Sequence, residues 1–109
     1  MTGEQRLATY GSLAPGRPNH HHVADLRGRW YPGAVRGRLV ESGWGAALGY
    51  PALVLDPQGP AVDVQVLESP DLPEHWPRLD AFEGPGYTRA VTTVETAAGT
   101  VEAQVYVLS

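Results

Sequence analysis

Two short segments hold the residues of this chain that could do chemistry. The first is Tyr10-Gly11-Ser12-Leu13, a loop after an apolar stretch. Its successive backbone N–H groups and its serine hydroxyl can form an anion-binding concavity, although a plain strand-ending turn is the alternative. The second segment ends in Glu83, a carboxylate where an apolar side chain is expected. Together they predict a site in which the loop holds an anion and Glu83 moves a proton.

The expected orientation of Glu83 follows from the apolar spacing of the one strong helix in the sequence. At about 100° per residue, Leu72, Trp76 and Leu79 fall within a stripe about 60° wide, and Phe82 widens it to about 120°. Glu83 falls on the same stripe, so its carboxylate is expected to face the core. Burial and the negative end of the helix dipole would both raise its pKa, which suits general acid–base chemistry. If the helix ended at Phe82, Glu83 would instead turn out to solvent.

We expect this helix over residues 69–83, with Ser69 capping its start and a proline in its first turn. Pro77 conflicts with that assignment, because a proline in a helix interior removes a hydrogen bond. An ordered helix that begins only near Trp76, after a looser turn, is therefore the alternative.

The rest of the chain alternates between short strand patterns and turns rich in glycine and proline. Strands are expected at residues 7–10, at 30–40 as two pieces with a bend at a glycine, at 52–55 after a turn at 49–51, at 61–67, and as a hairpin at 90–96 and 100–108. Val62, Val64 and Val66 share one face. A short helix is expected over residues 19–26, with Gly28 just past its end. This pattern predicts an α+β fold: a small, mixed, curled, barrel-like sheet with one or two short helices.

Composition excludes several classes of function. The 109 residues suffice for a single domain, residues 1–109, without disulfides. The absence of cysteine and lysine excludes a cysteine nucleophile, thiolate-bound zinc and a Schiff-base lysine. A net charge of −4 argues against a nucleic-acid partner. No apolar run approaches the roughly 20 residues of a membrane span, and the N-terminus has no hydrophobic signal region, so a cytoplasmic protein without a membrane partner is expected.

The run His20-His21-His22 does not predict a metal site. Consecutive residues on a helix point about 100° apart, so three in a row cannot converge on one ion, and the spacings of zinc ligands are absent. We expect an exposed run. A structural role for His20 in holding the preceding loop is the alternative.

Five segments, in order, resemble a known family. They are Tyr10-Gly11-Ser12-Leu13, Gly16-Arg17-Pro18-Asn19-His20, Gly49-Tyr50-Pro51-Ala52-Leu53, Leu79-Asp80-Ala81-Phe82-Glu83, and Tyr87 with Arg89. Their pattern resembles the gamma-glutamylcyclotransferase-like superfamily, nearest its gamma-glutamylamine cyclotransferase branch, over nearly the whole chain. The resemblance implies a compact barrel with small helices, no metal and no organic cofactor.

The resemblance also implies roles for particular residues. The loop from Tyr10 to Leu13 would hold the alpha-carboxylate and amine end of a gamma-glutamyl group, and Glu83 would be the catalytic acid–base. Tyr87 and Arg89 would shape the pocket or anchor the strand. The implied reaction is intramolecular aminolysis, in which the substrate's own alpha-amine attacks its gamma-carbonyl and releases 5-oxoproline and an amine. The implied partner is a small-molecule gamma-glutamyl substrate, and the protein is expected to be a monomer or weak homodimer.

Two departures from the family pattern leave the substrate open. Many members carry Gly-Glu within the strand that here spans residues 62–66, and Ala8 and Thr9 stand where larger apolar residues are usual. A different class of function also stays open: a non-catalytic member that binds a small acidic metabolite or acts in an assembly.

Overall fold

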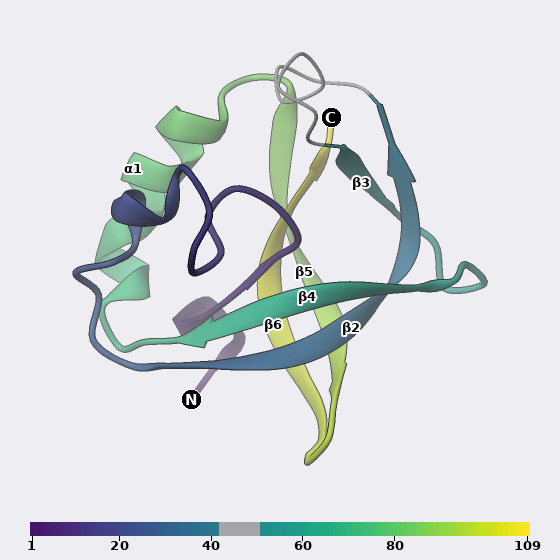
Figure 1. Ribbon diagram of the computed structural model, residues 1–109, viewed down its shortest axis with the longest axis horizontal. Helices are drawn as coiled ribbons and strands as arrows, with labels where there is room; N and C mark the ends of the chain where they lie inside the picture. The colour runs from purple at the N-terminus through teal and green to yellow at the C-terminus, as the bar shows by residue number, and fades with distance from the viewer. Residues whose placement is uncertain (42–50) are drawn as a thin grey trace.

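The computed structural model describes residues 1–41 and 51–109, so the turn expected at Gly49 and Tyr50 lies outside the described residues. The strands are β1 (Arg6–Thr9), β2 (Arg29–Val40), β3 (Ala52–Leu55), β4 (Ala61–Glu68), β5 (Tyr87–Thr96) and β6 (Gly99–Leu108). The helices of the described ranges are α1 (Leu72–Glu83) and the short 3₁₀ helices η1 (Gly3–Gln5) and η2 (His20–His22). Figure 1 shows α1 and η2 together on one side of the strands.

The sheet closes on itself to form a barrel. Its strand order is β3-β2-β4-β1-β6-β5, and a further pairing of Ala34 with Glu95 joins β2 to β5. Strands β2, β4, β1, β6 and β5 therefore form a closed ring, while β3 extends one end of β2. The pairing of β1 with β6 is parallel and the others are antiparallel. The predicted α+β fold with a small, mixed, barrel-like sheet is confirmed.

Strand β2 is continuous, which corrects the prediction of two pieces. It pairs with β4 from Arg29 to Arg36 and with β3 from Gly37 to Val40. At Gly37 a Cβ atom would lie 2.6 Å from the carbonyl oxygen of Val54. Only glycine allows β3 to come this close. At the glycine where a bend was expected, β2 instead changes its pairing strand from β4 to β3.

Side chains of the strands alternate between the barrel interior and the surface beneath α1. Val62, Val64 and Val66 lie in the interior cluster, as the period-two pattern predicts. Their neighbours there are Ala8, Val35, Leu53, Val94, Ala103 and Val105. Leu7 and Tyr106 belong to a second cluster, against which α1 packs. The barrel therefore has an apolar interior and one apolar outer face.

Helix α1 buries Leu72, Trp76 and Leu79, as its apolar spacing predicts. The prediction that Ser69 is its N-cap is wrong: the helix begins one residue after Asp71, and the buried Ser69 hydroxyl accepts a hydrogen bond of 3.1 Å from the Asp71 N–H. A start near Trp76 is wrong as well. Burial of two large side chains before Pro77 stabilises the first turns more than the missing hydrogen bond costs. None of the helices in the described ranges is long and apolar enough to cross a membrane.

The helix expected over residues 19–26 is reduced to η2. The chain instead turns through tight hydrogen bonds, from Val23 N–H to His20 O (2.9 Å) and from Leu26 N–H to Val23 O (3.2 Å). Val23 is buried in the cluster beneath α1, and the His20 Nδ1–H donates a 3.0 Å hydrogen bond to the carbonyl oxygen of Leu13. Histidine and valine are poor helix formers, so these long-range contacts decide the local structure. The alternative role of His20, holding the loop, is confirmed.

Candidate active site

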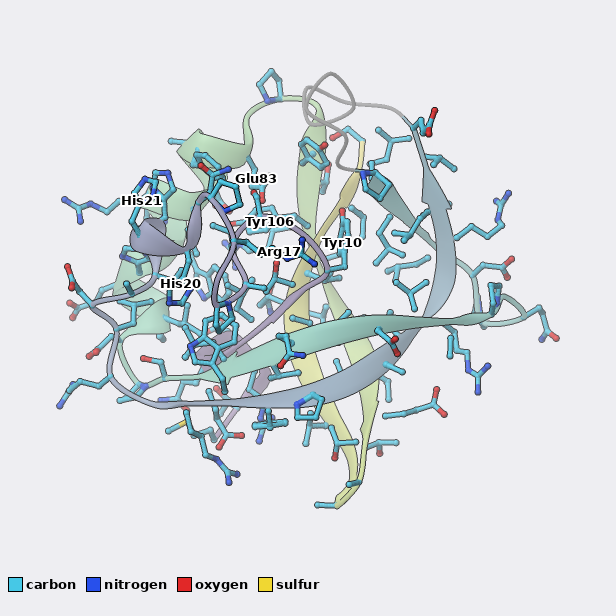
Figure 2. The ribbon with its side chains drawn as sticks, in the orientation of Figure 1. Tyr10, Arg17, His20, His21, Glu83 and Tyr106 are labelled. Atoms are coloured by element: carbon cyan, nitrogen blue, oxygen red, sulfur yellow. The ribbon has the colours of Figure 1, made fainter. Side chains whose placement is uncertain are left out.

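Glu83 and the loop after β1 line one small cavity of about 40 Å³. The end of β1, the last turn of α1 and strands β5 and β6 meet there. Its described lining residues are Leu7, Ala8, Thr9, Tyr10, Gly11, Ser12, Leu13, Pro51, Glu83, Tyr87 and Tyr106. Figure 2 shows Glu83 at the end of α1, with Tyr106 next to it. The structure thus brings together all six residues for which a catalytic or substrate-binding role is predicted.

The surroundings of Glu83 favour proton transfer near neutral pH. Burial raises the pKa of the Glu83 carboxyl to about 7. Burial also raises the pKa of Tyr10 and of Tyr106, with the negative charge of Glu83 as a smaller cause, so both hydroxyls stay protonated. Glu83 is the last residue of α1, and Gly84 ends the helix with a φ of 77°. A carboxyl group that titrates near 7 can both accept a proton and return it.

The loop after β1 offers hydrogen-bond donors to the cavity. Within the described part of the chain, the backbone N–H groups of Ser12 and Leu13 donate no hydrogen bond, and that of Gly11 makes only a long contact of 3.4 Å with Thr9 Oγ1. The Ser12 Oγ accepts a 2.9 Å hydrogen bond from Asn19 Nδ2, which leaves the hydroxyl hydrogen of Ser12 free to donate. This set of donors suits a carboxylate.

The hydroxyl of Tyr10 is committed to structure. It donates a hydrogen bond of 2.8 Å to the carbonyl oxygen of Tyr106 and accepts one of 3.0 Å from the Leu53 N–H. Tyr10 therefore joins the end of β1 to β6 and β3, and its ring forms a wall of the cavity. The substrate-binding role predicted for Tyr10 stays a prediction, as do the roles of the other cavity residues.

Tyr106 is a cavity residue that sequence reasoning missed. Its hydroxyl donates a 2.7 Å hydrogen bond to Asp80 Oδ1, and Arg89 Nε donates to the same oxygen at 2.9 Å. Burial opposes ionisation of Asp80, but these hydrogen bonds outweigh it and lower the pKa of Asp80. Arg89 also donates to Gln104 Oε1 at 3.2 Å, so it anchors β5 to both α1 and β6. A tyrosine within the apolar pattern of β6 could have signalled this role, because a buried hydroxyl needs a partner.

The histidine run lies away from the cavity lining. His20 packs its ring against Trp30, with 5.6 Å between ring centroids, and His21 is exposed. Among the residues that the structure describes, no group of three or more His, Asp or Glu side chains could hold a metal ion. The described residues of the cavity therefore give no sign of metal ligation, and the absence of a metal or cofactor requirement stays a prediction.

Comparison with known proteins agrees with the geometry. The family model described as gamma-glutamyl cyclotransferase, AIG2-like, matches residues 7–109. No curated protein matches the sequence. Among solved structures, YkqA from Bacillus subtilis is 27% identical with a TM-score of 0.74, and the alignment covers 96% of this chain but 36% of that one. An AIG2-like protein from Mus musculus is 25% identical with a TM-score of 0.72, covering 96% of this chain and 77% of that one.

A more distant structure extends the likeness at the level of the fold. A gamma-glutamyl cyclotransferase from yeast, specific to glutathione, is 15% identical with a TM-score of 0.58, covering 94% of this chain and 67% of that one. The barrel is thus shared even at this identity. The family model spans all the described strands except the first residue of β1, and it includes every residue of the candidate site. This chain belongs to the AIG2-like gamma-glutamyl cyclotransferase family.

Proposed function

We propose that this protein is a gamma-glutamyl cyclotransferase that releases 5-oxoproline and a free amine from a gamma-glutamyl amide. One observation carries the proposal: a half-buried carboxyl group, Glu83, with a pKa of about 7, lines the same small cavity as the donors of the Ser12–Leu13 turn. The carboxyl group can move protons, and the donors can fix an anion. Membership of the family supports the same activity.

The substrate would enter with its glutamyl end first. Its alpha-carboxylate accepts hydrogen bonds from the Ser12 and Leu13 N–H groups and from the Ser12 hydroxyl. The cavity of about 40 Å³ is far smaller than the roughly 300–1,000 Å³ of most small-molecule sites. It is therefore too small for a whole gamma-glutamyl amide, and the leaving part of the substrate would lie outside it.

The reaction needs alignment and the transfer of two protons, one after the other, from the alpha-ammonium nitrogen to the leaving nitrogen. The Glu83 carboxylate takes one proton from the alpha-ammonium group, and the freed amine nitrogen attacks the gamma-carbonyl carbon. The resulting tetrahedral intermediate carries an oxyanion, which a backbone N–H of the loop stabilises. Glu83 then returns its proton to the leaving nitrogen, the bond from the carbonyl carbon to that nitrogen breaks, and the carbonyl re-forms within a five-membered ring. The ring nitrogen still carries a second proton from the original ammonium group, and Glu83 passes this proton to the departing amine, which leaves as an ammonium ion. Because the nucleophile is tethered to its target, positioning supplies much of the rate.

A panel of substrates tests the proposal. We expect 5-oxoproline release from at least one class among gamma-glutamyl amines, gamma-glutamyl dipeptides and glutathione, with gamma-glutamyl amines the first choice. Ligand-induced thermal stabilisation without release from any of them would favour the non-catalytic binding protein instead. Size-exclusion chromatography of the same sample would test the predicted monomer or weak homodimer.

A further inference from the structure

A second, wider hollow adjoins the catalytic cavity on the other side of the β1 end. Its volume is about 300 Å³, and its walls include Arg17, Asp63 and Gln65. It shares Thr9, Tyr10 and Gly11 with the catalytic cavity. The end of β1 and the turn after it are therefore common to both hollows.

Gly11 places no side chain between the two hollows. A Cβ atom placed on Gly11 would meet no atom of the other described residues within 4 Å, so among these residues the space beside this backbone is open. An extended molecule that reached from one hollow to the other past Gly11 would meet no side chain of that residue. The outer hollow is thus placed to receive the part of a substrate that the catalytic cavity is too small to hold.

Arg17 brings an uncommitted positive charge to the outer hollow. Six of the eight arginines form ion pairs: Arg6, Arg27, Arg29, Arg36, Arg38 and Arg89. Within the described residues, the Arg17 and Arg78 side chains make no ion pair or hydrogen bond. Figure 2 shows the Arg17 side chain on the loop beside Tyr10. Its guanidinium group can therefore bind a carboxylate in two-point fashion without breaking an existing contact.

The loop that carries Arg17 is held in place by hydrogen bonds. The Arg17 N–H donates to the carbonyl oxygen of Ala14 at 3.0 Å, and the Asn19 N–H donates to that of Ser12 at 2.9 Å. Gly16 adopts a φ of 80°, which glycine allows and other residues rarely adopt. The same turns that present the Ser12 donors to one hollow therefore fix the base of Arg17 beside the other.

We propose that the outer hollow binds the leaving part of the substrate, and that Arg17 selects leaving amines that carry a carboxylate. This inference rests on the proposed cyclotransferase activity and specifies its substrate class. Asp63 lines the same hollow with the opposite charge and makes no ion pair with Arg17. Its carboxylate repels a second negative group, so a leaving amine with a single carboxylate, held at Arg17, fits the two charges.

Matched substrate pairs test this selection. Gamma-glutamylglycine is compared with gamma-glutamylmethylamide, and gamma-glutamyl-4-aminobutyrate with gamma-glutamylpropylamide, because the members of each pair differ only by a carboxylate. We expect Arg17→Gln to lower kcat/KM for at least one acidic substrate about fivefold, the scale of an exposed charge pair. For the neutral substrate of the same pair, kcat/KM should be the same in the variant and the parent. Added salt should reduce the difference between variant and parent on the acidic substrate. Arg17→Lys should keep part of the preference.

Two further variants make the test specific. Arg78→Gln removes the other arginine without an ion pair, which lines a different hollow together with His75. This variant should leave kcat/KM unchanged for both the acidic and the neutral substrates. Asp63→Asn should raise kcat/KM for the acidic substrates, whereas a fall would point to a cationic leaving group and overturn the inference. An equal effect of Arg17→Gln on both members of each pair would also overturn it. If the parent protein releases 5-oxoproline from none of the four compounds nor from the wider panel, the proposed activity itself fails.

Discussion

The hydroxyl of Tyr106 lies 2.7 Å from Oδ1 of Asp80, three residues before Glu83 on the same helix. This hydrogen bond fastens the last turn of α1 to β6 beside the catalytic cavity. Arg89 binds the same Asp80 oxygen from β5. The position of Glu83 is thus set by the strands on which α1 packs as well as by the helix itself.

Tyr106→Phe should impair turnover more than stability. Because the Asp80 side chain is 44% exposed, the lost hydrogen bond should lower the free energy of unfolding by only about 1 kcal/mol. A misplacement of about 1 Å can cost about 100-fold in rate, so we expect kcat to fall on the order of tenfold. Urea unfolding and 5-oxoproline release measure the two effects.

Tyr31→Phe is the matched control for that variant. The Tyr31 hydroxyl also donates to a carboxylate, Glu68 Oε2, at 3.0 Å, but outside the cavity lining. The Glu68 side chain is only 12% exposed, so the loss of stability should be larger, about 2 kcal/mol, with kcat unchanged. Equal losses of kcat in both variants would assign Tyr106 a purely structural role.

Glu83→Gln should abolish most activity without unfolding the protein. Glutamine keeps the volume and the hydrogen bonding but cannot accept and return a proton at neutral pH. General acid–base groups contribute about 10²–10⁴-fold, so kcat should fall by that order while substrate still binds. The melting temperature should stay level or rise, because a neutral amide avoids burying a charge. Glu74→Gln, at the exposed start of the same helix, should leave kcat at the parent value.

The titration of Glu83 should appear in both activity and stability. Its carboxylate is the base, so kcat/KM should rise with pH up to about 7, the pKa of Glu83. For stability the sign is opposite. The folded protein binds the proton more tightly than the unfolded chain, whose carboxyl titrates near 4.5, so the contribution of Glu83 to the free energy of unfolding declines between pH 4.5 and about 7.

The difference between parent and Glu83→Gln isolates this effect. His22 acts oppositely in part of the same range, because burial and the neighbouring His21 and His75 lower its pKa, so its contribution falls as pH drops. Glu68 and Asp71, whose pKa values are lowered to about 2, act only at more acidic pH. A parent-minus-variant curve that is flat from pH 4.5 to 7 would contradict the raised pKa of Glu83.

The loop donors should respond to product. In amide NMR spectra, added 5-oxoproline should shift the Ser12 and Leu13 N–H signals most, because these groups are free to donate to its carboxylate. Ser12→Ala should weaken product binding by about tenfold or more, through loss of one donor to a charged group. Shifts confined to other regions would remove the loop from the site.

Metal removal should have no effect. Chelation with EDTA is expected to leave both kcat and the melting temperature unchanged, since the proposed chemistry uses a carboxyl group and backbone donors. A loss of activity that zinc restores would assign a role to the histidine run or to residues beyond the described ranges.

The orientation of Glu83 was predictable because helical periodicity is local. Leu72, Trp76 and Leu79 define a buried stripe, and Glu83 follows it by simple geometry. The hydrogen bond from Tyr106 to Asp80 joins residues 26 positions apart and depends on how the barrel closes. No local pattern contains that information.

The same contrast explains the incorrect helix over residues 19–26. A proline before it and a glycine after it are helix signals, yet the His20 ring reaches back to Leu13 and Val23 enters the core. These tertiary contacts outweigh weak local preferences. The sequence predicted a barrel-like sheet but not which strands close it. The closing pair, Ala34 and Glu95, joins residues 61 positions apart in sequence.

The parallel pairing of β1 with β6 has a consequence for the nascent chain. Leu7 pairs with Gln104 and Ala8 with Val105, so β1 is synthesised long before its second neighbour exists. Until then β1 can pair with β4 on one edge only, and an unpaired strand edge is a template for misassociation. Such long-range pairing also slows folding. A ribosome-bound chain that ends before β6 would therefore carry Glu83 without the strand beneath it, and the active site would assemble only after β6 has emerged.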